Sequence, residues 1–154
     1  MAKITPFLWY DGKAEEAMNF YMSIFKNSEV LNISRNDDEG PGKAGTVMSV
    51  SFRLEGQEFI ALNGGPHFTF SPAISLFVSC DSQSEVDDLW AKLSSGGGET
   101  QRCGWLKDKY GVSWQIIPKA LGELLEDPDT AKSDRVWKAM LQMEKIDIKG
   151  LQEA

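Results

Sequence analysis

The feature that most constrains the fold is an internal repeat in the order of predicted elements. The segment KITPFLWYD is an apolar, strand-like run that ends in Asp11, and AISLFVSCD is another that ends in Asp81, 70 residues later. An amphipathic helical segment follows each aspartate, and further strand-like runs follow each helix. Two copies of one supersecondary unit explain this order best. The sequence therefore predicts two β-α-β-β-β modules in tandem.

In the first module, Pro6 favours a strand start or an edge strand, because proline cannot donate to a sheet ladder. The segment after Asp11 has apolar residues at helical spacing, namely Ala14, Ala17, Met18, Tyr21 and Phe25. The runs TVMSVSFRLEG and QEFIALNGG alternate apolar and polar residues around Glu55-Gly56-Gln57. This pattern predicts a hairpin. The acidic residues 37–39 lack the spaced ligands of a calcium loop and indicate a solvated loop.

The second module repeats the scheme. Ser82 or Ser84 is expected to cap a helix that turns Val86, Leu89, Trp90 and Leu93 inward. The three glycines at 96–98 follow this helix and precede a strand, whereas a phosphate-binding loop follows a strand and opens a helix. They therefore indicate a helix end and a turn. Further strands are expected in ETQRCGWL and SWQIIP.

The residues from about Lys119 onward change character. KALGELLED is helical in pattern and stops at DPDT, after which Ser133 is expected to cap a helix over DRVWKAMLQMEKI. Its apolar stripe predicts packing on the outside of the sheet or on a partner subunit, through Val136, Trp137, Met140, Leu141 and Met143. We expect one domain over residues 1–154, with modules at about 1–65 and 73–118 and a helical tail at about 119–154.

The composition of the chain excludes several classes of binding partner. The net charge of −7 and the pI of about 4.7 argue against binding to nucleic acid or to an anionic membrane surface. There is no signal-peptide pattern and no apolar run long enough for a membrane span, so a cytoplasmic protein is expected. Cys80 and Cys103 are too few for a disulfide framework or a zinc cluster and are expected to be small apolar residues near strand ends.

Four stretches carry a resemblance to a known family: PFLWYDGKAEEAMNFY, LNGGPHFTFSPAISLFVSCD, GWLKDKYGVSWQIIP and RVWKAMLQMEKIDI. Together with the tandem modules, they resemble the vicinal-oxygen-chelate (glyoxalase/bleomycin-resistance) superfamily and, within it, the PhnB-like group also called 3-demethylubiquinone-9 3-methyltransferase-like. The resemblance implies an α+β fold in which the two modules form a mixed-sheet half-barrel cleft, followed by C-terminal helices. It also implies a homodimer.

The resemblance further implies a site on inward-facing strand positions. In the superfamily up to four such side chains, usually His and Glu, bind a divalent metal. The positions that correspond are Thr5, Asn63, Ser75 and Gln115, all polar and all neutral. Because catalytic metals need imidazole, thiolate or carboxylate ligands, we expect no metal here. The methyltransferase label implies S-adenosylmethionine, but the chain lacks the strand, glycine-rich loop and helix of a common methyltransferase domain, so no cofactor is expected.

Aromatic residues are expected to line the cleft. Phe7 and Trp9 share the face of Thr5 by strand alternation, and Phe68, Phe70 and Trp105 are further candidates. Trp114 should point the opposite way from Gln115, toward the helices, while Trp90 and Trp137 are expected in the core. His67, the only histidine, is a candidate general acid or base, although an exposed or structural histidine is the commoner outcome.

Three functions remain open from the sequence. The first is a metal-free protein that binds a small molecule through the aromatic cleft and the four neutral polar positions, in which hydroxyls and amides both donate and accept hydrogen bonds. The second is an enzyme of the same fold, in which a metal, His67 or the named methyl transfer supplies the chemistry. The third is a scaffold that acts through its dimer surface. Gln115 and Asn63 could also bond only to each other or to buried water.

Overall fold

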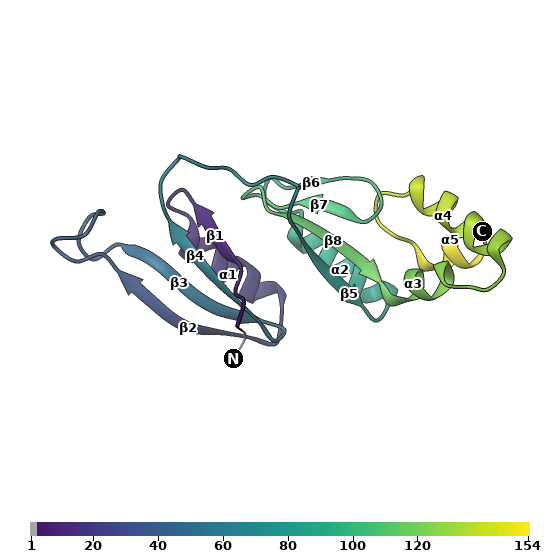
Figure 1. The fold of residues 1–154 in the computed structure, drawn as a ribbon, viewed down its shortest axis with the longest axis horizontal. Helices are drawn as coiled ribbons and strands as arrows, with labels where there is room; N and C mark the ends of the chain where they lie inside the picture. Colours follow the sequence, from purple (N-terminus) through teal and green to yellow (C-terminus); the bar gives the residue numbers. More distant parts are fainter. Residues whose placement is uncertain (1–2) are drawn as a thin grey trace. The chain divides into compact units, whose positions relative to one another are not determined.

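A computed structural model describes residues 3–154, which form two compact units that meet in sequence between Phe70 and Ser71 (Figure 1). The first unit contains, in order, β1 (Phe7–Tyr10), α1 (Ala14–Ile24), β2 (Ser28–Arg35), β3 (Val47–Leu54) and β4 (Gln57–Asn63). The second contains β5 (Ser75–Cys80), α2 (Gln83–Leu93), β6 (Glu99–Thr100), β7 (Trp105–Lys107), β8 (Ser113–Pro118), α3 (Lys119–Leu125), α4 (Thr130–Leu141) and α5 (Ile148–Gln152).

Each unit is built on a four-stranded mixed sheet. The strand order is β1-β4-β3-β2 in the first and β5-β8-β7-β6 in the second. In both sheets the first strand pairs parallel with the last, and the remaining neighbours pair antiparallel. The predicted α+β fold with two β-α-β-β-β modules is thus confirmed. That the two units act as one domain stays a prediction.

One helix covers one face of each sheet. Helix α1 buries five residues, Ala14, Ala17, Met18, Tyr21 and Ile24, and α2 buries Val86, Leu89 and Leu93. The strand residues on the helix side are also buried, among them Phe52, Ala61, Leu106, Trp114 and Ile116. Because side chains alternate along a strand, the residues between them lie on the other face, which we call the distal face. Trp114 is on the helix side, as predicted, and Trp90 is half-buried.

The last hairpin of each unit is closed differently. In the first unit the predicted turn is present, with φ of 47° at Glu55 and 87° at Gly56, the conformation that a two-residue hairpin loop needs. In the second unit the carboxylate of Asp108, only 2% exposed, accepts hydrogen bonds from the backbone of Tyr110 and Val112 and from Trp114 Nε1, at 2.9, 3.1 and 2.9 Å. A buried side chain thus organises the β7–β8 turn.

The tail packs around a small core of its own within the second unit, made of Leu121, Val136, Met140, Ile146 and Leu151. Ile117 at the end of β8 packs against this core. Backbone bonds from Cys103 to Met143 and from Gly104 to Glu144, both 2.8 Å, tie the tail to the residues before β7. The tail therefore lies against the end of the second sheet. Its packing on a partner subunit stays a prediction.

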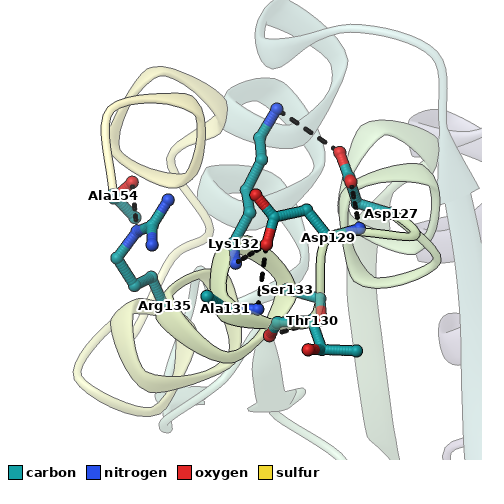
Figure 2. A network of polar contacts seen from close by, with 8 residues as sticks. All are labelled: Asp127, Asp129, Thr130, Ala131, Lys132, Ser133, Arg135 and Ala154. Carbon is teal, nitrogen blue, oxygen red and sulfur yellow. Dashed lines mark hydrogen bonds and ion pairs between the residues drawn. The ribbon is translucent and has the colours of Figure 1, made fainter.

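Two predictions for the tail were wrong. Helix α4 begins at Thr130, and its cap is Asp129, whose carboxylate accepts from the backbone of Ala131 and Lys132 (Figure 2). Ser133 lies inside the helix and donates to the Thr130 carbonyl at 3.1 Å. Asp127 pairs with Lys132 and accepts from the Asp129 backbone, so local carboxylates set the start of the helix one turn earlier than the serine suggested.

Trp137 is not a core residue, because its exposure is 51%. Only part of the predicted stripe is buried: Val136 and Met140 face the tail core, whereas Trp137 and Leu141 face outward. The apolar stripe of this helix is therefore wider than the face that it buries. None of the helices among residues 3–154 combines the length and apolarity that crossing a bilayer would require.

Candidate functional site

The distal face of the second sheet holds a row of three side chains on neighbouring strands. Strand register pairs Phe77 of β5 with Gln115 of β8, and Gln115 with Trp105 of β7. Paired residues project on the same face, so an amide stands between two aromatic rings. Phe77 is 59% exposed, and Trp105 and Gln115 are partly buried. Two of the predicted site residues, Gln115 and Trp105, are thereby brought together beside Phe77, which was not predicted.

Ser75 joins this row through a hydrogen bond. Gln115 Nε2 donates to Ser75 Oγ at 2.9 Å, between side chains that are 40 residues apart in sequence. The amide keeps one N–H and its carbonyl oxygen for another partner, and the hydroxyl keeps its own proton. Gln115 and Ser75, two of the four positions implied by the family resemblance, thus form one polar pair.

A second hydroxyl lies beside this pair. Ser113 pairs in register with Ser75 and with Lys107, on the same face as Gln115. Its side chain is 1% exposed, and Oγ has no hydrogen-bond partner among the described residues. A buried hydroxyl without a partner is uncommon and costs free energy. Lys107 pairs in turn with Glu99 of β6, so a second row, next to the first, consists of Ser75, Ser113, Lys107 and Glu99.

The distal face of the first unit is more apolar. Register pairs Phe7 with Ile60 and Trp9 with Leu62, so the residue that corresponds to Gln115 is an isoleucine. Phe7 is 57% exposed, close to the 59% of its counterpart Phe77. Thr5, the counterpart of Ser75 by the offset of the repeat, is partly buried and precedes β1.

Trp9 is held by the loop after β4. Its Nε1 donates to the Gly65 carbonyl at 2.9 Å, and its ring meets Phe68 edge-on at 4.9 Å. A methyl group at Gly64 would collide with the Trp9 indole, so glycine is required there for the indole to pack against the backbone of residue 64. Phe68 remains 65% exposed. Trp9 and Phe68, both predicted site residues, therefore form an aromatic pair on the first unit.

Asn63 lies elsewhere. It pairs in register with Tyr10, a buried residue on the helix side of the first sheet. Its Oδ1 accepts from the backbone of Ala14 at 2.8 Å, and its Nδ2 donates to the Val47 carbonyl at 3.1 Å. The amide thus ties the start of α1 to the start of β3. A ligand-binding role for Asn63 stays a prediction without support from these contacts.

The remaining candidates lie in the loop that leaves β4. Phe70 meets the ring of Tyr10 at 5.1 Å, which places it at the end of β1. His67 is exposed, and its catalytic role stays a prediction.

The residues at these positions do not fit a divalent metal. Among residues 3–154 there is no group of three or more His, Cys, Asp or Glu side chains that could hold one. The donors at the family positions are hydroxyls and amides, which carry no charge to offset the desolvation of the cation. S-adenosylmethionine has no matching loop either, because β1 joins α1 through residues 11–13 and β5 joins α2 through residues 81–82.

Sequence reasoning missed Phe77 and Ser113 on the distal face of the second sheet, and Ile60 in the first unit. Phe77 lies two residues after Ser75 on β5, so alternation alone could have placed it on the same face. Ser113 begins β8 two residues before Gln115, so alternation alone could have placed it on the distal face. Ile60 as the counterpart of Gln115 could not be found without the register, since Asn63 is the polar residue at the end of the matching strand. Asp108 was recognised as part of a turn, but its burial depends on the tertiary contact with Trp114.

Comparison with known proteins agrees with this architecture. The sequence pattern of the family described as 3-demethylubiquinone-9 3-methyltransferase matches residues 2–117. No curated protein matches the chain. A PhnB protein from Bacillus cereus, a candidate 3-demethylubiquinone-9 3-methyltransferase, is 47% identical, with a TM-score of 0.70 over 76% of this chain and 99% of that chain.

Two more distant structures share the fold. A Pseudomonas aeruginosa protein is 19% identical, with a TM-score of 0.62 over 77% of this chain and 98% of that chain. The fosfomycin resistance protein FosX of Listeria monocytogenes, in complex with Mn(II) and sulfate, is 16% identical, with a TM-score of 0.53 over 74% of this chain and 90% of that chain. The matched family region ends at residue 117, so α3 to α5 lie outside it.

Proposed function

The chain belongs to the 3-demethylubiquinone-9 3-methyltransferase (PhnB-like) family of the glyoxalase/bleomycin-resistance superfamily, and from that premise we propose that it binds a small molecule without a catalytic metal. The bound molecule lies on the distal face of the second sheet, over Gln115. The observation that carries the proposal is the bond between Gln115 and Ser75, which forms a neutral polar pair beside the exposed ring of Phe77. A few convergent polar groups among aromatic side chains are typical of small-molecule sites.

Neutrality of the donors favours binding over metal chemistry. An amide and a hydroxyl can donate to and accept from an organic molecule, and Gln115 keeps one N–H and its carbonyl oxygen for such a partner. A role of Thr5, Phe7, Trp9 and Phe68 in ligand binding stays a prediction. We also propose that the protein is cytoplasmic and that it is a homodimer. Exposed apolar side chains at equivalent places in both units support the homodimer, namely Ile4 and Ile74.

Native mass spectrometry of protein purified without added metal or chelator tests this function. It reports the number of subunits, any retained organic molecule and any bound metal in one measurement. A dimer that carries an organic molecule and no stoichiometric metal is the expected result. One zinc, nickel, manganese or iron ion per site would contradict the proposal.

The alternative is the methyl transfer in the family name, which requires S-adenosylmethionine. Isothermal calorimetry with this compound tests it directly. We expect no heat of binding at micromolar protein, because the short β-α connections offer no loop to hold the nucleoside. Saturable binding would favour the enzyme over the binding protein.

A further inference from the structure

The tail contributes an irregular segment, residues 143–148, that leads from α4 into α5 and that we call the strap. At its start, the backbone N–H groups of Cys103 and Gly104 donate to the carbonyls of Met143 and Glu144, both at 2.8 Å. Cys103 and Gly104 directly precede β7 in the chain. The start of the strap is therefore hydrogen-bonded to the residues that lead into a strand of the second sheet.

The end of the strap is held by α2. The side-chain amide of Gln83 donates from Nε2 to the Ile146 carbonyl at 2.9 Å and accepts at Oε1 from the Ile148 N–H at 2.7 Å. Lys145 pairs with Asp87 of the same helix at 2.9 Å, and Ile146 is fully buried. One glutamine side chain thus satisfies two backbone groups of the strap, which is fixed at both of its ends.

The strap contacts the chain where the backbone conformation is uncommon. The φ angle is 59° at Cys103 and 81° at Gly104, in the left-handed region, which is unfavourable for a residue with a Cβ such as cysteine. On the other side, the Gly104 carbonyl accepts from the Ile116 N–H of β8 at 2.7 Å. The conformation of residues 103 and 104 is thus set between the strap and β8, the strand that carries Gln115, and Trp105 is the next residue in the chain.

From these contacts, we propose that the strap is a positioning element of the ligand site. It keeps residues 103 and 104 in the left-handed conformation and thereby fixes Trp105 beside Gln115, with Gln83 as its anchor on α2. When the strap is loosened, Cys103 leaves the unfavourable region and the entry of the chain into β7 changes. The proposal rests on the proposed function, and it gives a role to the tail, whose helices lie outside the matched family region.

Amide hydrogen exchange of the full-length wild-type protein gives the first test. The amides of Cys103, Gly104 and Ile148 all bond across the strap, although they lie far apart in sequence. Their protection factors should agree within about tenfold, because one opening of the strap releases all three. A larger difference among them would overturn the proposal, and this measurement needs no variant.

Two variants on α2 give the second test. Gln83→Ala removes both bonds of the side-chain amide to the strap and should lower the protection of Cys103 and Gly104 by about tenfold. Asp88→Ala is the matched control, because it breaks an exposed ion pair within the same helix and should leave both protection factors unchanged. Far-UV circular dichroism would establish that both variants are folded. Equal protection in the two folded variants would contradict the role of Gln83.

A second substitution separates positioning from general stabilisation. In ¹H–¹⁵N spectra, Gln83→Ala should shift the backbone and indole signals of Trp105. Adding Cys103→Gly should move these signals back toward wild type, because glycine adopts positive φ without steric cost. Adding Cys103→Ala instead, which keeps a Cβ, should not. Rescue by both substitutions, or by neither, would contradict the claim that the strap holds this conformation.

Native mass spectrometry distinguishes failure of this inference from failure of the proposed function. Gln83→Ala should retain at least about threefold less organic molecule than Asp88→Ala. If Gln83→Ala shifts Trp105 but retains as much as wild type, the positioning role is wrong and the binding function stands. If wild type itself retains no molecule, the proposed function is wrong and the role of the strap in binding is wrong with it.

Discussion

The two units have the same topology and register, yet they differ at the strand position beside their exposed phenylalanine. Phe7 and Phe77 are exposed to nearly the same degree, 57% and 59%. Phe7 pairs with Ile60, whereas Phe77 pairs with Gln115. A duplicated scaffold has thus kept its aromatic side chain in both copies and a polar recognition group in one. Under the proposed function, this difference assigns the polar recognition group to the second unit.

The two units also differ in how their last hairpin is closed. Backbone conformation at Glu55 and Gly56 closes the turn in the first unit, and a buried carboxylate closes it in the second. Asp108 thereby orients Trp114 and the start of β8, the strand that carries Gln115. The unit with the polar site is also the one whose last hairpin depends on a side-chain network.

The largest effect is expected from Asp108→Ala. It would leave two backbone N–H groups and the Trp114 indole without their acceptor, in a place where Asp108 is 2% exposed. We expect the free energy of unfolding to fall by about 3 kcal/mol, measured by urea denaturation. Asp108→Asn keeps one acceptor oxygen and should lose less. If the alanine variant lost less than about 1 kcal/mol, the conclusion that the Asp108 carboxylate holds the β7–β8 turn would be contradicted.

A smaller effect is expected from Gly64→Ala in the first unit. The added methyl would displace the Trp9 indole and break its bond to the Gly65 carbonyl. We expect a loss of about 2 kcal/mol in thermal or chemical unfolding, together with a change in near-UV circular dichroism. Gly122→Ala is the matched control, because a methyl group at that helical glycine meets no neighbour within 4 Å. It should stabilise slightly, by about 0.5 kcal/mol. Equal effects of the two substitutions would show that Trp9 is not anchored by this loop.

The smallest effect concerns Cys80, whose counterpart in the first unit is Tyr10. Burial, aided by Glu85 and Asp81, raises the pKa of the Cys80 thiol to about 12 from 9.0. Because the unfolded thiol ionises first, stability that is fully present below pH 9 is lost as pH rises from about 9 toward 12. Replacing the thiol in Cys80→Ala removes this contribution. In urea denaturation, the free energy of unfolding of Cys80→Ala minus that of wild type should rise by about 1 kcal/mol from pH 7 to pH 10. A pH-independent difference would show that the thiol ionises as easily in the folded protein.

Much of the architecture was predictable because it depends on local pattern. The helical spacing from Ala14 to Phe25, the turn at Glu55 and Gly56, and the cap at Ser82 are all present as expected. The tail was harder, since Asp127, Asp129 and Ser133 all have short polar side chains that can cap. In the structure Asp129 is the cap, and Asp127 supports it through the Asp129 backbone and Lys132. Gln115 and Ser75 were named from the family resemblance, and the structure joins them by a hydrogen bond, whereas the position of Asn63 depends on how β4 pairs with β1. Their role in ligand binding stays a prediction.

The central claim is that the polar row of the second unit, and not its apolar counterpart, holds the ligand. A reciprocal exchange tests it: Gln115→Ile makes the second unit resemble the first, and Ile60→Gln does the reverse. Native mass spectrometry of both variants and of wild type would be compared under identical purification. We predict that wild type and Ile60→Gln retain an organic molecule and that Gln115→Ile loses it. Retention by Gln115→Ile, or loss only in Ile60→Gln, would contradict the account.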